Sequence, residues 1–168
     1  MSAWRDDSEL SLFNQQSDQS DWVPVSDALF EVLQKAQEVS KLTDGAFDVT
    51  IGPVVNLWGF GPKAQPEQSP SEDTLARVLS NTGFDKLELR SDPPAVRAMP
   101  SQYVDLSAIA KGYGVDAVAR FLEREGVSAY LVEIGGEVRV NGRKPDGSTW
   151  RLAIEQPTSA GREVNRIV

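Results

Sequence analysis

The spacing of apolar residues changes several times along this chain, and that change limits the folds open to it. Residues 26–43 (SDALFEVLQKAQEVSKLT) place apolar side chains at the period of an amphipathic helix. Residues 84–90 (FDKLELR) and 95–99 (AVRAM) alternate instead, which is typical of half-buried strands around the turn SDPP. Helical and strand periods are therefore interspersed. The sequence predicts an α+β or mixed α/β fold, with helices packed on a mixed sheet.

Capping signals predict where the helices begin. Ser26 is the expected N-cap of the first helix. A second helix is expected from Pro70 to about Gly83, with Ser69 as N-cap and Glu72 closing a capping box. A long helix is expected over 108–125 with Ser107 as its N-cap.

The remaining segments predict loops and strands. The proline-rich stretch 61–70 (GPKAQPEQSP) indicates a surface loop. Residues 129–134 form an expected strand that Gly135 and Gly136 end. Residues 137–141 and 149–155 are expected to pair as a hairpin around GRKPDG, and the tail 158–168 begins another alternating stretch.

Composition excludes several classes of site. The chain has 17 Lys+Arg, 25 Asp+Glu and a net charge of −8, which argues against a nucleic-acid-binding face. It contains no cysteine and no histidine, so disulfides, zinc fingers, thiolate nucleophiles and a Ser-His-Asp relay are excluded within these residues. No apolar run is long enough to cross a bilayer, and no signal peptide follows Met1. We expect either a cytosolic protein or a chain that lacks its natural start.

The stretch 105-DLSAIAKGYGVDAVARFLEREG-126 carries two glycines in the opening turns of the long helix. Each glycine costs a helix interior roughly 0.8–1 kcal/mol relative to alanine. Gly112 and Gly114 could let the helix pack closely on a sheet, with Lys111 solvated. They could equally let a phosphate-bearing ligand approach a helix N-terminus where Lys111 adds a positive charge.

Three further segments combine glycines, aromatic rings and carboxylates. In 44-DGAFDVTIGPVVNLWGFG-61, the density of rings and glycines suits a planar aromatic ligand, although core packing explains it equally well. The double glycine in 133-EIGGEVRVNG-142 indicates a tight turn, or a backbone that approaches a phosphate. The segment 1-MSAWRDDSELSLFN-14 is by itself only a polar stretch with one tryptophan.

Taken together, these four segments resemble the FAD:protein FMN transferase (ApbE) family. The resemblance covers nearly the whole chain in the family's order, and DLSAIAKGYGVD is its most specific block. It implies an ApbE, T-fold-like α+β domain over residues 1–168. The domain is expected to be incomplete at both ends, because family members are about twice as long.

The resemblance also assigns binding residues. It implies that Trp4 stacks on the flavin nucleotide and that the tripeptide Ala46, Phe47 and Asp48 contacts FAD. Asp105 matches an FAD-binding aspartate, and Lys111 matches a lysine on the nucleotide side. Ala108 matches the position whose backbone carbonyl helps to hold Mg²⁺, and Glu137 stands where the family often has aspartate. No catalytic residue is assigned.

The implied reaction is the Mg²⁺-dependent transfer of FMN from FAD to a threonine hydroxyl of an acceptor flavoprotein, with release of AMP. Three alternatives stay open from the sequence: an FAD-binding module without transfer activity, an FAD pyrophosphatase that gives FMN and AMP, and an acidic interaction domain without a ligand. Two metal ligands and a histidine-bearing segment belong to the family's C-terminal half and cannot be matched here. By resemblance, the whole protein is expected to be periplasmic or a membrane-anchored lipoprotein.

Overall fold

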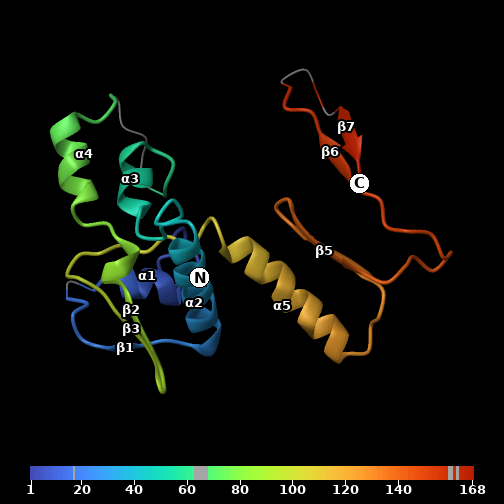
Figure 1. Ribbon diagram of the computed structural model, residues 1–168, viewed down its shortest axis with the longest axis horizontal. Coiled ribbons are helices and arrows are strands. Elements are labelled where there is room, and N and C mark those ends of the chain that lie inside the picture. The colour runs from blue at the N-terminus through green and yellow to red at the C-terminus, as the bar shows by residue number, and fades with distance from the viewer. Residues whose placement is uncertain (17, 63–67, 159–160, 162) are drawn as a thin grey trace. The chain divides into compact units, whose positions relative to one another are not determined.

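The computed structural model describes residues 1–16, 18–62, 68–158, 161 and 163–168. The chain folds as two compact units, Met1–Ala110 and Lys111–Val168, and each is described by itself (Figure 1). Among the described residues, no helix is both long and apolar enough to cross a membrane.

The first unit packs helices around a small antiparallel sheet. Its elements are α1 (Glu9–Asn14), β1 (Val23–Pro24), α2 (Asp27–Leu42), α3 (Gly52–Leu57), α4 (Glu72–Leu79), the short 3-10 helix η1 (Phe84–Lys86), β2 (Glu88–Ser91) and β3 (Pro94–Arg97). The sheet order is β1-β3-β2, with Val96 of β3 opposite both Val23 and Leu89. Helix α2 packs on β2 and β3 (Figure 1).

The apolar face of α2 forms much of the core, as its period predicts. Its buried positions recur at helical spacing, at Leu29, Val32, Leu33 and Ala36. The Ser26 hydroxyl accepts the Leu29 N–H at 3.2 Å, which confirms Ser26 as the N-cap. Other buried apolar residues of this unit are Leu10, Phe13, Val25, Val49, Leu87, Ala95, Val96, Ala98, Val104 and Leu106.

Helix α1 is held by polar side chains that the sequence presented only as a polar stretch. The Glu9 carboxylate accepts both the backbone N–H and the hydroxyl of Ser26. The Asn14 side chain donates to the Val104 carbonyl at 2.8 Å and accepts the Val104 N–H at 2.9 Å. Val104 is fully buried, so Asn14 satisfies two backbone groups that water cannot reach. The polar pattern of residues 8–14 therefore has a structural purpose.

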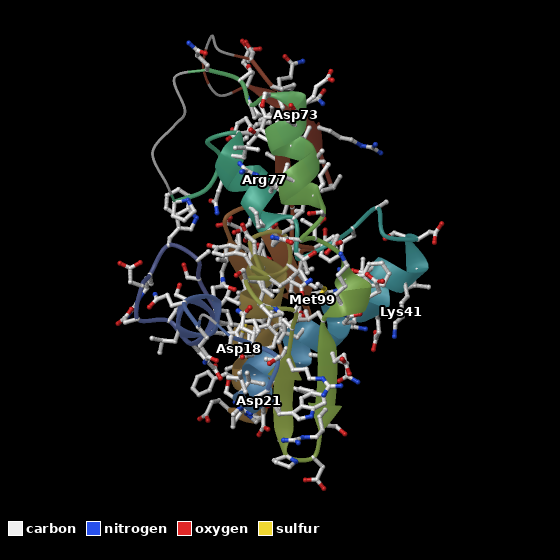
Figure 2. The ribbon with its side chains drawn as sticks, turned by 90° about the vertical axis from the view of Figure 1, so that its left-hand side faces the viewer. Asp18, Asp21, Lys41, Asp73, Arg77 and Met99 are labelled. Carbon is white, nitrogen blue, oxygen red and sulfur yellow. The ribbon has the colours of Figure 1, made fainter. Side chains whose placement is uncertain are left out.

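Helix α4 begins later than expected. Ser71, not Ser69, is the N-cap: its hydroxyl accepts the Thr74 N–H at 3.3 Å. No residue of α4 is buried, and the helix contacts α3. Asp73 and Arg77 stand one turn apart on α4, an arrangement that favours an exposed helix (Figure 2). The expected 61–70 loop falls largely on 63–67, outside the described residues.

The second unit consists of α5 (Ala110–Arg124) and two hairpins, β4 (Tyr130–Ile134) with β5 (Glu137–Asn141), and β6 (Ala153–Glu155) with β7 (Val164–Ile167). Its core is a cluster of apolar side chains from α5 and β4, namely Val115, Ala119, Tyr130 and Val132, with Leu122 packed against it. Arg139 of β5 pairs with both Asp116 and Glu123 of α5 at 2.9 and 3.0 Å. These ion pairs fix the hairpin on the helix.

Several expected elements were wrong in detail. Residues 137–141 pair with β4 through the Gly135-Gly136 turn, not with residues 149–155. The turn is favoured because both glycines adopt positive φ, 59° and 98°, and a two-residue loop needs that conformation. Residues 84–86 form η1 rather than a strand, and α3 was not expected. Helix α5 begins at Ala110, so Ser107 lies in the turn ahead of it rather than at its cap.

The bond between Asn14 and Val104 gives a stability prediction. Replacing Asn14 with alanine leaves the buried Val104 N–H and carbonyl unpaired, and we expect the free energy of unfolding to fall by about 1–3 kcal/mol. Urea denaturation measures this change. The exposed Asn81→Ala variant is the matched control and should change stability by less than about 0.5 kcal/mol. Equal stability of the two variants would contradict the role of Asn14.

Candidate ligand pocket

An apolar pocket of about 240 Å³ lies in the first unit between two turns, 46–51 and 105–108. Its apolar wall comes from Phe47, Val49, Ile51 and Val55. Asp48, Asp105 and Ser107 add polar groups to this wall. The pocket also includes Ala46 and Ala108. It thereby brings together five positions that the resemblance assigned to ligand or metal binding: Ala46, Phe47, Asp48, Asp105 and Ala108.

The end of α2 directs the chain into the first turn. Asp44 and Gly45 adopt positive φ (51° and 79°), and the Gly45 N–H bonds to the Ser40 carbonyl at 2.8 Å. The Thr43 hydroxyl then accepts the Phe47 N–H at 3.1 Å. A Cβ on Gly45 would lie 3.3 Å from the Phe84 ring, so glycine is suited to this position by space as well as by φ. The DGAF sequence is therefore a helix C-terminus that reverses the chain.

The side chain of Asp48 is engaged inside the protein. Its Oδ1 accepts the backbone N–H and the hydroxyl of Thr50, both at 2.7 Å. Its Oδ2 accepts the Phe84 N–H at 3.1 Å. The Thr50 hydroxyl in turn accepts the Gly83 N–H at 2.7 Å, and Thr50 is fully buried. Asp48 thus joins the pocket turn to the segment that begins η1.

The second turn is joined to the first by a backbone hydrogen bond. The Asp105 N–H donates to the Val49 carbonyl at 2.7 Å. The Asp105 Oδ1 accepts the Ser107 N–H at 2.8 Å, which fixes the carboxylate at the turn. A Cβ on Gly52 would lie 2.6 Å from the Tyr103 ring and 2.9 Å from the Asp105 Cβ. Burial raises the pKa of Tyr103, in keeping with this close packing.

Lys111 belongs to the second unit and has its own partners there. Its Nζ lies 2.8 Å from the Glu137 Oε2 and donates to the Gly135 carbonyl at 2.9 Å. The hydrogen bond from Lys111 lowers the pKa of Glu137. An ammonium group has three N–H donors, so these two partners among the described residues leave one donor for a ligand anion. The structure therefore gives Lys111 and Glu137, both named by the resemblance, a direct ion pair.

Trp4 lies on an ordered turn of the first unit but outside the pocket wall. Its side chain is 65% exposed. The turn is fixed because the hydroxyls of Ser8 and Ser11 both donate to the Ser2 carbonyl, at 2.6 and 3.0 Å. An exposed indole on a fixed turn is available for stacking, so its assignment to the flavin stays a prediction.

The two glycines of α5 have different surroundings. A Cβ on Gly114 would lie 3.3 Å from the Ile134 Cδ1, so close packing on β4 explains this glycine. A Cβ on Gly112 would have no heavy atom of the described residues within 4 Å. Packing therefore explains one of the two glycines.

A larger hollow of about 400 Å³ lies between α2 and β2, and none of the predicted site residues line it. Its wall consists of Phe30, Gln34, Gln37, Glu38, Lys41, Leu87, Leu89 and Ser91. The Gln37 amide already donates to the carbonyls of Phe84 and Leu87, at 2.7 and 3.0 Å. We favour the smaller pocket because apolar walls with a few convergent polar groups are typical of ligand sites.

No three Asp, Glu, His or Cys side chains gather into a group that could hold a metal ion, within the described parts of the chain. The 105–108 turn instead offers isolated oxygen donors: a carboxylate at Asp105, a hydroxyl at Ser107 and backbone carbonyls.

The sequence model of the ApbE family matches residues 1–168. The chain belongs to the ApbE family. It is 45% identical over 172 residues to the FAD:protein FMN transferase of Haemophilus influenzae, and 46% identical over 168 residues to that of Vibrio cholerae. Each alignment covers 100% of this chain and 50% of the relative. The chain therefore spans about half the length of the curated relatives it matches.

Solved ApbE structures share the fold. The flavin transferase ApbE from Vibrio cholerae superposes with a TM-score of 0.89 at 46% identity, and the ApbE protein from Thermotoga maritima with 0.86 at 28% identity. In both cases 99% of this chain and 53% of the other are covered. These similarities confirm the family resemblance and the α+β fold class.

Sequence analysis missed part of the pocket's framework. Gly83 and the Val49 carbonyl were not singled out, and Thr50 was considered only as part of the 44–61 segment, although all three hold the pocket turns. An aspartate two residues before a threonine is a local signal for an Asx turn and could have indicated the Asp48–Thr50 pair. Nothing local could have indicated Gly83, because it is 33 residues from Thr50.

The Gly52 contact gives a second stability prediction. Gly52→Ala places a methyl group against Tyr103 and Asp105, and we expect the free energy of unfolding to fall by about 1–3 kcal/mol through overpacking. Gly112→Ala is the control, because its Cβ has open space among the described residues and alanine favours a helix. Thermal and urea denaturation should show Gly52→Ala destabilised and Gly112→Ala as stable as the parent or more so. A Gly52→Ala variant with unchanged stability would contradict the close packing.

Proposed function

We propose that this chain forms the FAD-binding part of an enzyme that transfers FMN from FAD to a threonine hydroxyl of an acceptor protein. The single observation that carries the proposal is the pocket itself. Two segments far apart in the sequence, DGAFDV and DLSA, line one apolar hollow. DLSA belongs to the block on which the family resemblance is most specific, and DGAFDV belongs to another block of the same resemblance. The names of the relatives, FAD:protein FMN transferase, support the same activity.

The pocket suits one portion of FAD. Its volume of about 240 Å³ lies below the roughly 300–1,000 Å³ typical of pockets that enclose a drug-sized ligand. We therefore propose that it receives a single ring system or a nearby part of the dinucleotide. Phe47 offers a ring for stacking, and Asp105 offers a carboxylate for hydroxyl or amino groups. Lys111 is proposed to neutralise phosphate charge with the N–H that its two partners leave free.

In the proposed reaction, the threonine oxygen attacks the phosphorus on the FMN side of the pyrophosphate. The bond from that phosphorus to the bridging oxygen breaks, and AMP leaves with the bridging oxygen. The threonine hydroxyl releases its proton to the solvent, and a phosphodiester joins FMN to the acceptor. Negative charge grows on the leaving phosphate, so the protein must stabilise it electrostatically.

The oxygen donors of the 105–108 turn fit Mg²⁺, which prefers oxygen ligands and usually takes only a few of them from protein. We propose that the Ala108 carbonyl is one of these ligands. When bound, Mg²⁺ supplies charge neutralisation at the phosphate oxygens. By the family resemblance, two further metal ligands are expected in the C-terminal half of family members, beyond the part that this chain matches.

The proposed activity can be tested on the whole protein that contains this chain, incubated with FAD, MgCl₂ and a threonine-bearing flavoprotein subunit. Transfer is expected to leave fluorescent flavin on the acceptor in a denaturing gel, with one AMP released for each flavin. Equal amounts of free FMN and AMP would indicate hydrolysis instead, and bound but intact FAD would indicate a binding module. Absence of both FAD binding and AMP would contradict the proposal.

Periplasmic or membrane-anchored localisation of the whole protein stays a prediction, to be tested by cell fractionation.

A substitution at Lys111 tests whether this side chain neutralises phosphate charge of FAD. Lys111→Ala removes an ammonium donor from the proposed phosphate side, and we expect the Kd for FAD to rise about tenfold or more. Lys35→Ala is the matched control, because Lys35 also forms an exposed ion pair with a glutamate, Glu38. Its Kd should stay within about twofold of the parent. Equal FAD affinity of the two folded variants, measured by fluorescence titration, would exclude Lys111 from the FAD site.

A further inference from the structure

The Asp48 carboxylate has internal partners on both of its oxygens. Oδ1 accepts two hydrogen bonds from Thr50, and Oδ2 accepts one from the Phe84 N–H. A carboxylate oxygen accepts about two hydrogen bonds, so Oδ1 is saturated. A direct bond from Asp48 to a ligand would add to, or replace, bonds that hold the turn. The side chain is therefore built into the frame of the pocket.

Residues 83–84, to which Asp48 and Thr50 are bonded, are also held by two glutamine side chains. The Gly83 carbonyl accepts the Gln102 amide at 2.9 Å, and the Phe84 carbonyl accepts the Gln37 amide at 2.7 Å. Thr50 and Gln102 are 0% and 1% exposed, so water does not compete for these bonds. Residues 83–84 thus form a fixed point to which Asp48 and Thr50 attach the pocket turn.

Val49 connects the turn that Asp48 and Thr50 hold to the second pocket turn, 105–108. It lies between Asp48 and Thr50 in the chain and is buried, with 2% of its surface exposed. Its carbonyl accepts the Asp105 N–H at 2.7 Å, and Asp105 in turn accepts the Ser107 N–H. Hydrogen bonds, together with the short backbone segments between them, therefore connect Gly83 and Phe84 to Asp105.

From these contacts we infer that Asp48 and Thr50 are positioning residues, which set the place of Asp105 in the pocket through the Val49 carbonyl. In this role the Asp48 side chain does not contact FAD, and the tripeptide Ala46–Asp48 meets its ligand through Phe47 and the backbone. That the ligand is FAD rests on the proposed function. That Asp48 and Thr50 position Asp105 rests only on the contacts described above.

Thr50→Val tests the inference, because valine keeps the shape of threonine and removes the hydroxyl that joins Asp48 to Gly83. We expect the Kd for FAD to rise about tenfold, because the bond from the hydroxyl to Asp48 and the bond from the Gly83 N–H to the hydroxyl are both lost. Thr50→Ser restores the hydroxyl and should return the Kd to within about threefold of the parent. Asp48→Asn keeps an acceptor for Thr50 and loses only the Phe84 bond, so its effect should be smaller than that of Thr50→Val. The exposed Thr149→Val is the control and should bind FAD as the parent does.

A second measurement needs no ligand. In the free chain, the Asp105 amide should exchange with solvent at least about tenfold faster in Thr50→Val than in the parent, and at the parental rate in Thr50→Ser and Thr149→Val. All variants are measured well below their unfolding temperatures. If Thr50→Val does not fold, Asp48→Asn is compared with Thr50→Ser instead. The Asp105 amide is then expected to exchange faster only in Asp48→Asn.

The outcomes separate the inference from the proposed function. A large loss of FAD affinity in Asp48→Asn with none in Thr50→Val would show that Asp48 contacts FAD directly and would overturn the inference. Unchanged affinity and exchange in both variants would overturn it as well. If the parent chain binds no FAD, the proposed function fails, and the exchange of the Asp105 amide then decides the positioning by itself.

Discussion

The hydrogen bond from the Asp105 N–H to the Val49 carbonyl holds together the two turns that make the candidate site. These turns are more than 50 residues apart in the chain, so no local preference brings them to one place. Each turn also has internal hydrogen bonds. Those of the first turn join Asp48 and Thr50, and that of the second joins the Asp105 side chain to the Ser107 N–H. Because backbone groups form the central contact, the pocket depends on the position of the main chain more than on any one lining side chain.

Around this bond, polar side chains join distant segments of the first unit. Asn14, Gln37 and Gln102 each satisfy backbone groups of distant segments. Such bonds are specific in direction, and leaving one unmade in a buried place costs about 1–3 kcal/mol. They therefore specify one arrangement of the loops around the pocket. In the segment 8-SELSLFN-14, Glu9 and Asn14 form bonds of this kind to residues outside α1.

Sequence periodicity predicted the parts of the fold that depend on local pattern. Helix α2, its Ser26 cap and the glycine turn between β4 and β5 all follow from spacing and turn chemistry. The pairing of residues 137–141 with 149–155 was predicted wrongly, although the local Gly135-Gly136 turn already favours pairing with β4. Short helices were also missed, because α1 and α3 have six residues each and show less than two turns of periodicity. For the site, the resemblance identified residues that line the pocket, whereas the internal bonds of Asp48 needed the structure.

The central claim is that the turns 46–51 and 105–108 together receive FAD. Amide hydrogen exchange of the chain with and without FAD and Mg²⁺ tests it most directly, because exchange reports each segment separately. The account predicts slower exchange in both turns on addition of FAD, with no change along the α2–β2 hollow around Gln34 and Leu89. Protection confined to that hollow, or absent from both turns at saturating FAD, would contradict it.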